Sequence, residues 1–324
     1  MIPPIFRKLK PFLPLIGIIL FFYLLYTLDI NQIITAILSI PPSYLLVSAV
    51  LTIPILFIRT YAWTLILKEH HIRLRFFQAM KIYLIGYFYG SITPGYLGQL
   101  MRIPYMKEKT NEPYGKLFVN SVLETTIHTL SLYALMLIGA FLIVGTQPFL
   151  FIVVALWLFV VIIVFWYFTR KERGEKIFFA LIRYLTPKQM KPDLNRFVTT
   201  FYHDFPKIRK LILPFLIGII TWVIAFTQQY LIVLALGLTI PYLYFLLLFP
   251  IANTAGFIPI TFAGLGVREF TAIFLFSTLF HITGEKVFVF TLVGFLVTDL
   301  LTGFYGFILS LTEPRKIQTL FPQK

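Results

Sequence analysis

Two arginines follow glycine-bearing breaks in apolar stretches, where a charged side chain is costly. Arg102 comes four residues after Gly98, and Arg268 comes four residues after Gly264, with Gly266 between them. A helix that restarts at such a break directs unpaired backbone N–H groups and the positive end of its dipole forward. Together with an arginine, this helix start suits an anion such as a phosphate or a carboxylate. The alternative is that each arginine only caps a helix or pairs with an acid.

Three acidic residues and one histidine lie beside these arginines or inside other apolar runs. Glu269 directly follows the second arginine, and Asp299 lies near the centre of the last apolar run. Asn120, Glu124 and His128 are spaced four residues apart, so on a helix they form one polar stripe. We expect the acids and the histidine to balance the arginine charges or to couple movement to protons. Interhelical salt bridges and a satisfied buried imidazole are the structural alternatives.

The composition indicates that these residues lie in a membrane protein. Hydrophobic residues make up 59% of the 324, charged residues only 13%, and the mean hydropathy is +0.87. A soluble domain has about a quarter of its residues charged, so this chain has too little polar surface to face water alone. The net charge of +15 does not indicate nucleic-acid binding, because the basic residues cluster beside the apolar runs. The absence of cysteine excludes thiol catalysis.

The apolar runs predict an all-α polytopic protein with a single integral membrane domain over residues 1–324. A spanning helix needs about 20 apolar residues. Six runs qualify: 12–28, 44–67, 117–144, 148–169, 211–236 and 287–311. Arg59, late in the second run, is interpreted as reaching toward the cytoplasm along its aliphatic stem.

The loop charges predict an orientation with both termini in the cytoplasm of a plasma-membrane protein. The loop 170–210 carries eleven Lys and Arg residues, whereas loops 29–43, 145–147 and 237–242 carry none. If the six runs each cross once, the broken stretches 76–106 and 243–281 must return to the side they left. We therefore expect two re-entrant hairpins that enter from opposite faces, as in an inverted repeat.

The turns of the two expected hairpins resemble each other. The first contains Pro94 and Gly95 before Gly98, and the second contains Pro259 before Gly264. In each, a proline ends one helix and a Gly-x-x-x-Arg sequence opens the next. This similarity supports the inverted repeat.

The sequence contains no motif for several common kinds of enzyme chemistry. No Walker loop, HExxH sequence or metal-spaced acid cluster is present, so we expect no catalytic residue, metal or cofactor. The expected partner is a membrane phospholipid, not a nucleic acid. A homo-oligomer or a separate lipid-modifying enzyme is a further expected partner.

The chain resembles the lysylphosphatidylglycerol synthetase transmembrane family, also called the flippase-like domain family. The resemblance covers roughly residues 10–312 and rests on short motifs. They are Arg59-Thr-Tyr-Ala-Trp63, Tyr83-x-x-Gly86-x-Phe88, Pro94-x-x-x-Gly98-x-x-x-Arg102, Glu124 and Pro259-x-x-x-x-Gly264-x-Gly266-x-Arg268-Glu269. A typical family turn has a second glycine where Gln99 stands here.

The resemblance implies a flippase-like protein that moves an anionic or aminoacylated phospholipid, or a related lipid, between leaflets. The aminoacyl-transferase domain of some relatives has no counterpart in this sequence, so lysyl transfer is not implied. In this interpretation the two arginines and the three turn glycines bind the lipid headgroup. The alternatives are an integral membrane transferase or transferase subunit acting on lipid-linked sugars, and a scaffold without transport.

Overall fold

The computed structural model describes residues 15–169, 208–258 and 261–312. Three features of the sequence analysis lie outside the described residues, namely Pro259, residues 12–14 of the first expected span and residues 170–207 of the basic loop.

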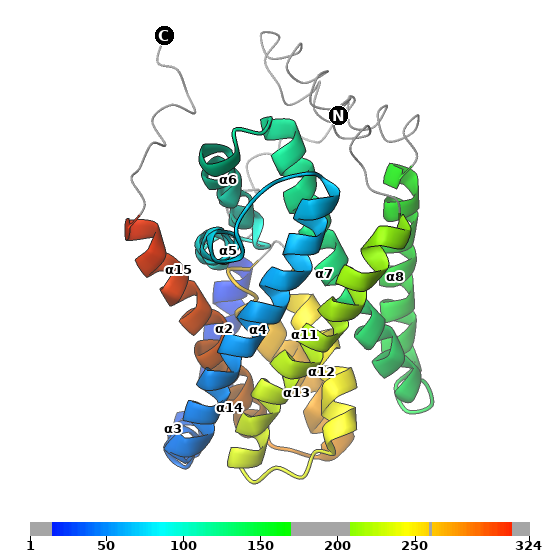
Figure 1. The fold of residues 1–324 in the computed structure, drawn as a ribbon. Helices are drawn as coiled ribbons and strands as arrows, with labels where there is room; N and C mark the ends of the chain where they lie inside the picture. The colour runs from blue at the N-terminus through cyan, green and yellow to red at the C-terminus, as the bar shows by residue number, and fades with distance from the viewer. Residues whose placement is uncertain (1–14, 170–207, 259–260, 313–324) are drawn as a thin grey trace, which may run out of the picture.

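The described chain is helical, as the composition predicts, and its helices form one elongated bundle (Figure 1). The first half contains α2 (Leu15–Thr27), α3 (Ile30–Leu38), α4 (Pro42–Glu69), α5 (Phe76–Ser91), the 3₁₀ helix η2 (Leu97–Met101), α6 (Arg102–Thr110), α7 (Tyr114–Leu142) and α8 (Pro148–Thr169). The second half contains α11 (Ile208–Ala235), α12 (Tyr242–Gly256), α13 (Val267–Phe280), α14 (Gly284–Phe295), the π-helix η4 (Leu296–Leu300) and α15 (Leu301–Thr312).

Four described helices are long and apolar enough to cross a membrane: Pro42–Glu69, Tyr114–Leu142, Arg209–Ala235 and the continuous stretch Gly284–Thr312. The bent pair α2 and α3 is a fifth candidate if it is counted as one span. The four long helices coincide with the expected spans 44–67, 117–144, 211–236 and 287–311, α2 alone lies in the expected span 12–28, and the helix α8 coincides with the expected span 148–169. A multi-pass helical membrane protein is therefore confirmed.

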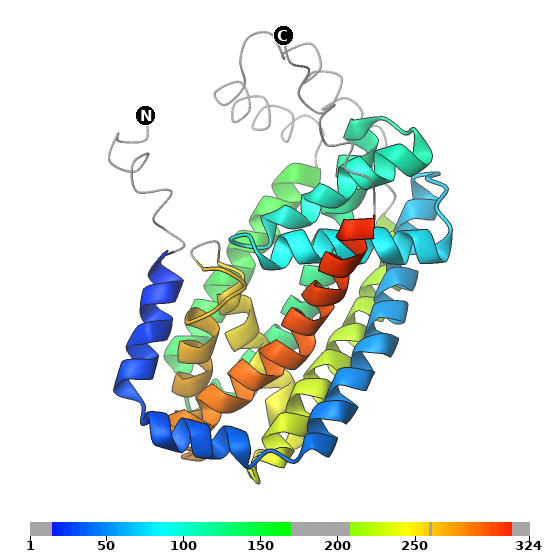
Figure 2. The same ribbon diagram turned by 90° about the vertical axis from the view of Figure 1, so that its left-hand side faces the viewer.

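The segment 29–43, expected to be a loop, contains the helix α3. Asp29 precedes α3 and accepts hydrogen bonds from the backbone N–H groups of Asn31 and Gln32, which caps the helix. The chain turns by 92° between α2 and α3. In Figure 2, α3 consequently lies across the long helices at one end of the bundle.

Both broken stretches form helix–turn–helix units. In the first, α5 leads through a turn into η2 and α6; in the second, α12 leads through a turn into α13. The two turns meet inside the bundle, where Pro94 and Phe262 form an antiparallel β-bridge. Figures 1 and 2 show α5 first end-on and then from the side, so this helix lies across α4 and α11.

Close approach explains two of the glycines in the first unit. A Cβ atom on Gly98 would lie 2.0 Å from the backbone oxygen of Tyr89, so a side chain does not fit there. A Cβ on Gly90 would lie 2.5 Å from Cγ of Gln99. The side chain of Gln99 is therefore accommodated by a glycine on the facing helix.

Basic side chains of the described loops gather at one end of the bundle. Lys68 lies in the last turn of α4 and Lys107 in the last turn of α6, while Lys116 and Lys210 lie in the first turns of α7 and α11. Within the described ranges, Lys286 is the one Lys or Arg at the opposite end. The start of α2 and the end of α15 lie at the basic end (Figure 2).

Candidate functional site

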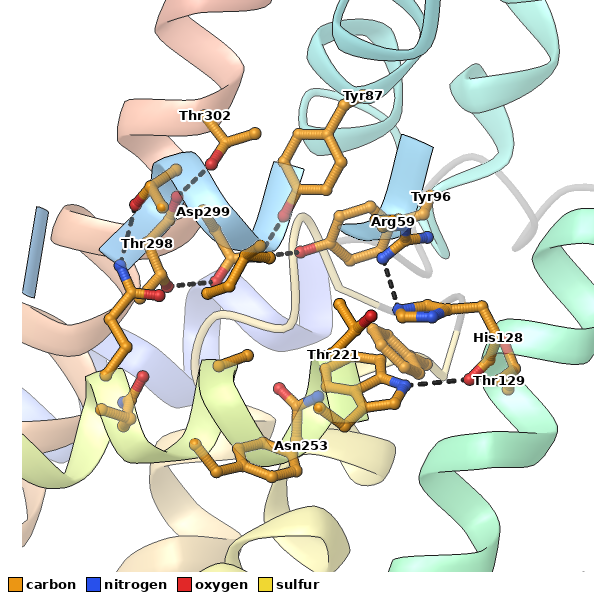
Figure 3. A pocket seen from close by; sticks show the side chains of 18 of the residues that line it. Arg59, Tyr87, Tyr96, His128, Thr129, Thr221, Asn253, Thr298, Asp299 and Thr302 are labelled. Carbon is orange, nitrogen blue, oxygen red and sulfur yellow. Dashed lines mark hydrogen bonds between the residues drawn. The ribbon is translucent and has the colours of Figure 1, made fainter. Parts of the chain in front are cut away.

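The two turns border a central cavity of about 220 Å³. Its walls come from α4, α5, α7, α11, α12, α13 and the π-helix η4 (Figure 3). Most of the wall is apolar or hydroxylated, and the charged side chains that line it within the described structure are Arg59, Arg268 and Asp299. The cavity thus joins residues from both halves of the chain at the point where the hairpin turns meet.

Asp299 accepts hydrogen bonds from hydroxyl groups and has no ion pair with any described residue. Tyr87 and Tyr96 both donate to its Oδ1, the second at 3.4 Å, and Thr298 donates to its Oδ2 at 2.8 Å. Figure 3 shows both tyrosines pointing toward it from the first hairpin. Asp299 lies in a π-helix, a conformation often found at functional sites, and no sequence pattern predicted this π-helix.

Arg268 lies on the cavity wall and pairs with the residue that follows it. Its Nη2 and Nε lie 2.6 and 3.0 Å from Oε1 of Glu269, whose Oε2 accepts the backbone N–H of Gly266 at 2.6 Å. Gly266 has a φ of +84°, and Gly264 has a φ of +80°, a conformation that favours glycine. The turn glycines therefore hold Arg268 at the start of α13, with Glu269 as its neighbouring counter-charge.

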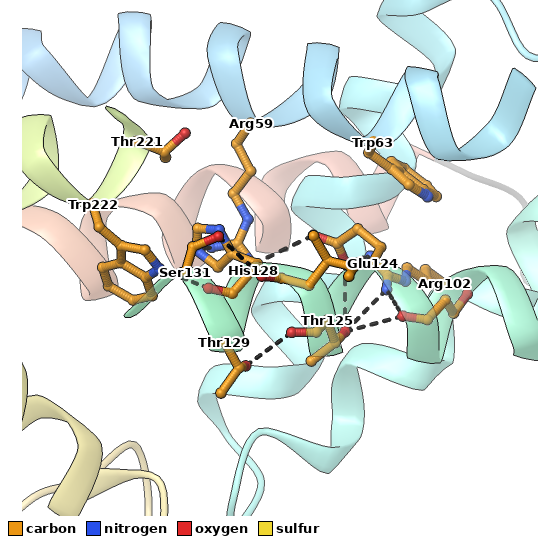
Figure 4. A network of polar contacts seen from close by, with 12 residues as sticks. Arg59, Trp63, Arg102, Glu124, Thr125, His128, Thr129, Ser131, Thr221 and Trp222 are labelled. Atoms are coloured by element: carbon orange, nitrogen blue, oxygen red, sulfur yellow. Dashed lines mark hydrogen bonds and ion pairs between the residues drawn. The ribbon is translucent and has the colours of Figure 1, made fainter. Parts of the chain in front are cut away.

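Arg102 lies behind the cavity wall, in a buried network with Glu124 (Figure 4). Its Nη1 is 2.7 Å from Oε2 of Glu124, and its Nη2 donates to the backbone oxygen of Ser121. Its guanidinium also lies over the ring of Trp63, 5.0 Å from the centroid. The role of Arg102 in headgroup binding stays a prediction, since in this arrangement its neighbours are protein groups.

Arg59 is a cavity residue whose position the sequence analysis did not anticipate. Its Nη2 is 3.6 Å from Oε1 of Glu124, and its Nη1 is 2.5 Å from Nε2 of His128. An arginine can only donate, so Nε2 accepts and this imidazole is neutral. The Nε of Arg59 is buried and has no hydrogen-bond partner within the described structure. It is therefore a donor on a cavity residue that the described protein groups leave unsatisfied.

The sequence did contain a signal for Arg59. It lies ten residues before the end of α4, which is about 15 Å along the helix. That distance exceeds the length of an arginine side chain, so Arg59 cannot reach water at the helix end and must be satisfied inside the bundle. Its ring neighbour is Tyr83, whose centroid lies 5.0 Å from the guanidinium carbon.

The predicted polar stripe on α7 faces the interior, but its residues contact different neighbours. His128 lines the cavity, where it stacks on Trp222 with the centroids 4.6 Å apart. Glu124 joins the two arginines, one on the cavity wall and one behind it. Asn120 lies farther away and bonds to Trp63 and His70.

The charges on the cavity wall and in the ion pairs beside it balance as a set, but those on the wall alone do not. The set contains three arginines and three acids: Arg59, Arg102, Arg268, Glu124, Glu269 and Asp299. Of these, only two arginines and Asp299 line the cavity. The wall therefore presents one more positive than negative charge, and it suits an anionic group.

The sequence also matches known proteins. A family model described as "Lysylphosphatidylglycerol synthase TM region" matches residues 13–306. The chain is similar to the UPF0104 membrane protein MJ1595 of Methanocaldococcus jannaschii, with 21% identity over 306 residues that cover 90% of each chain. The matched family region contains both hairpin turns and every residue that lines the central cavity.

Proposed function

Because the chain belongs to the lysylphosphatidylglycerol synthase TM-region family, we propose that it moves a phospholipid with an anionic headgroup between membrane leaflets. The observation that carries this proposal is the central cavity beside the two turns, which Arg59, Arg268 and Asp299 line together. Charged and hydroxyl-bearing side chains line part of the cavity, while the outer faces of the surrounding helices carry exposed apolar residues. Such a cavity suits a headgroup that crosses while its chains stay in the bilayer.

We place Arg59 and Arg268 on the lipid phosphate. Arginine binds phosphate through two parallel N–H groups, and such charge-assisted hydrogen bonds are the strong ones. Arg102 acts on the phosphate only indirectly, because it shares the carboxylate of Glu124 with Arg59. When a phosphate binds Arg59, Glu124 remains paired with Arg102 and is not left uncompensated.

The membrane arrangement in this proposal has six crossings and two re-entrant hairpins of opposite orientation. The meeting of the hairpin turns at Pro94 and Phe262 supports it, since tips that enter from opposite sides meet in the middle. In this arrangement the basic end of the bundle and both termini lie on the cytoplasmic side of the cell membrane. Irregular backbone at membrane depth requires a protein or water-filled surrounding, and the cavity supplies one.

Arg59→Gln tests the headgroup site with the least damage to the fold. Glu124 keeps Arg102 as a partner in this variant, so no buried carboxylate loses its last counter-charge. Purified protein is reconstituted in vesicles with fluorescent phosphatidylglycerol, and dithionite reports headgroup movement. Losing a charge-assisted hydrogen bond of about 1.5 to 3 kcal/mol predicts a fall in rate of roughly ten- to a hundredfold.

The matched control is Arg73→Gln, which removes one positive charge from an exposed loop. We expect it to move lipid at the wild-type rate. Equal rates for Arg59→Gln and wild type would refute the assignment of Arg59. No acceleration over protein-free vesicles with any lipid tested would refute transport, and chemical change of a lipid-linked sugar by mass spectrometry would then favour the transferase alternative.

A further inference from the structure

A second hollow opens beside the central cavity. It has a volume of about 350 Å³ and lies between the turn before η2, the middle of α7 and the helix α8. Six residues line both spaces, so the two adjoin along a shared wall: Gly95, Tyr96, Gln99, Thr125, Thr129 and Tyr133. The remaining lining residues are Leu97, Leu100, Val122, Thr126, Leu130 and Val161. We call this space the lateral groove.

The lateral groove changes from polar to apolar as it leaves the cavity. Its inner part shares the hydroxyl groups of Thr125 and Thr129 with the cavity, and its outer part contains Val122, Leu130 and Val161. Among the described residues, no charged side chain lines it. A space that is cationic at one end and apolar at the other matches an amphiphile, whose headgroup and chain need opposite surroundings.

The position of α8 opens the lateral groove toward the side of the bundle. This helix packs on α7 and stands at the edge of the fold in Figure 1. At the other border, Leu97 exposes 66% of its surface. A groove that opens sideways between such apolar surfaces leads to hydrocarbon and not to water.

The length of the lateral groove corresponds to one leaflet. Its α7 lining extends from Val122 to Tyr133, which is about 16 Å along the helix. The hydrocarbon core is about 30 Å thick, so one leaflet contributes about half of that. A chain that extends from the cavity along this groove would fit one leaflet's depth.

We propose that the lateral groove holds a hydrocarbon chain of the lipid whose headgroup occupies the central cavity. This inference rests on the proposed function and adds the path of the apolar part. The substrate class is therefore a lipid with a long chain, and a free phosphate compound would use only the cavity. The lipid enters between η2 and α8 without its chain crossing the polar centre.

Val122→Trp tests the lateral groove by filling it from α7. Its matched control is Ala49→Trp, in another apolar hollow that Pro42, Leu45 and Leu301 help to line. That hollow shares no lining residue with the central cavity. We expect Val122→Trp to slow long-chain phosphatidylglycerol movement about tenfold or more, and Ala49→Trp to change it less than about twofold, since filling a lipid-facing hollow leaves the path open.

A binding measurement separates the lateral groove from transport itself. In detergent, affinities are measured for long-chain phosphatidylglycerol and for glycerol phosphate. We expect Val122→Trp to weaken binding of the long-chain lipid only. Vesicles that show no lipid movement with wild type would refute the proposed function, and the lateral groove would still be tested by binding. Equal long-chain affinity in Val122→Trp and wild type would overturn the lateral groove.

Discussion

Replacing Glu124 by Gln removes the single carboxylate that two arginines share inside the bundle. Glu124 exposes 4% of its surface and lies 2.7 Å from Arg102, which exposes 1%. Its other oxygen lies 3.6 Å from Arg59. The substitution keeps the shape of the side chain and cancels its charge, so both guanidinium groups lose their counter-ion without a cavity being created.

The magnitude follows from burial. Removing one partner of a buried ion pair costs about 3 to 5 kcal/mol, because the remaining charge is left uncompensated. Arg102 keeps the backbone oxygen of Ser121 and the ring of Trp63, which stabilise it partly. We therefore expect Glu124→Gln to lower the free energy of unfolding by about 3 kcal/mol, at the lower end of that range.

The assay is reversible unfolding in mixed micelles, followed by circular dichroism as the denaturing detergent is increased. The half-buried pair Glu112 and Lys116, with a distance of 3.0 Å and a spacing of four residues where α7 begins, gives the control Glu112→Gln. We expect that control to cost less than about 1 kcal/mol, because both side chains keep contact with water.

A double-mutant cycle decides whether the charge pair is the cause. Arg102→Met combined with Glu124→Gln removes both partners, so the loss should be smaller than the sum of the single losses by about 1 to 3 kcal/mol. Additive losses within about 0.5 kcal/mol would refute the shared-carboxylate reasoning, because they would mean that the two residues act independently.

Three further outcomes are expected. Gly98→Ala should destabilise the protein by about 2 kcal/mol or more, since the new Cβ would meet the backbone oxygen of Tyr89. Gly145→Ala, with open space around it, should change stability little, and equal melting temperatures of the two variants would contradict this prediction. Asp299→Asn should slow lipid movement in vesicles while leaving the fold intact, because two tyrosine hydroxyls still bond to the amide oxygen; an unchanged rate would exclude a role in transport. Asp29→Ala should cost about 1 kcal/mol of stability through loss of the α3 cap, and an unchanged unfolding curve would show that the cap is dispensable.

The family and the multi-pass helical class were predicted from the sequence, and both are confirmed. Long apolar runs can only be satisfied as helices in hydrocarbon, so their positions follow from composition and length. The helix breaks were also predictable, because Pro94 and the glycines that follow it leave the helical conformation for local reasons. The helix α3 was missed because its nine residues are too short to span.

The partners of the buried charges were not predictable. The spacing of Asn120, Glu124 and His128 indicated a common helix face, but it contained no information on which helix lies opposite. Contacts between residues far apart in sequence assign Glu124 to Arg59 and Arg102, and leave Asp299 to tyrosine hydroxyls. From the spacing alone, Arg102 and Arg268, which follow the glycine breaks, could not be distinguished.

The sequence by itself therefore determined that apolar helices carry a few costly charges and two broken turns, because helix periodicity and transfer free energy are local properties. Only the tertiary structure decided which charges face the cavity. Packing of α4 and α7 with the first hairpin puts Arg102 behind the wall and Arg59 on it, whereas Arg268 stays on the wall. Burial and counter-charge depend on neighbours in space, and those neighbours come from distant parts of the chain.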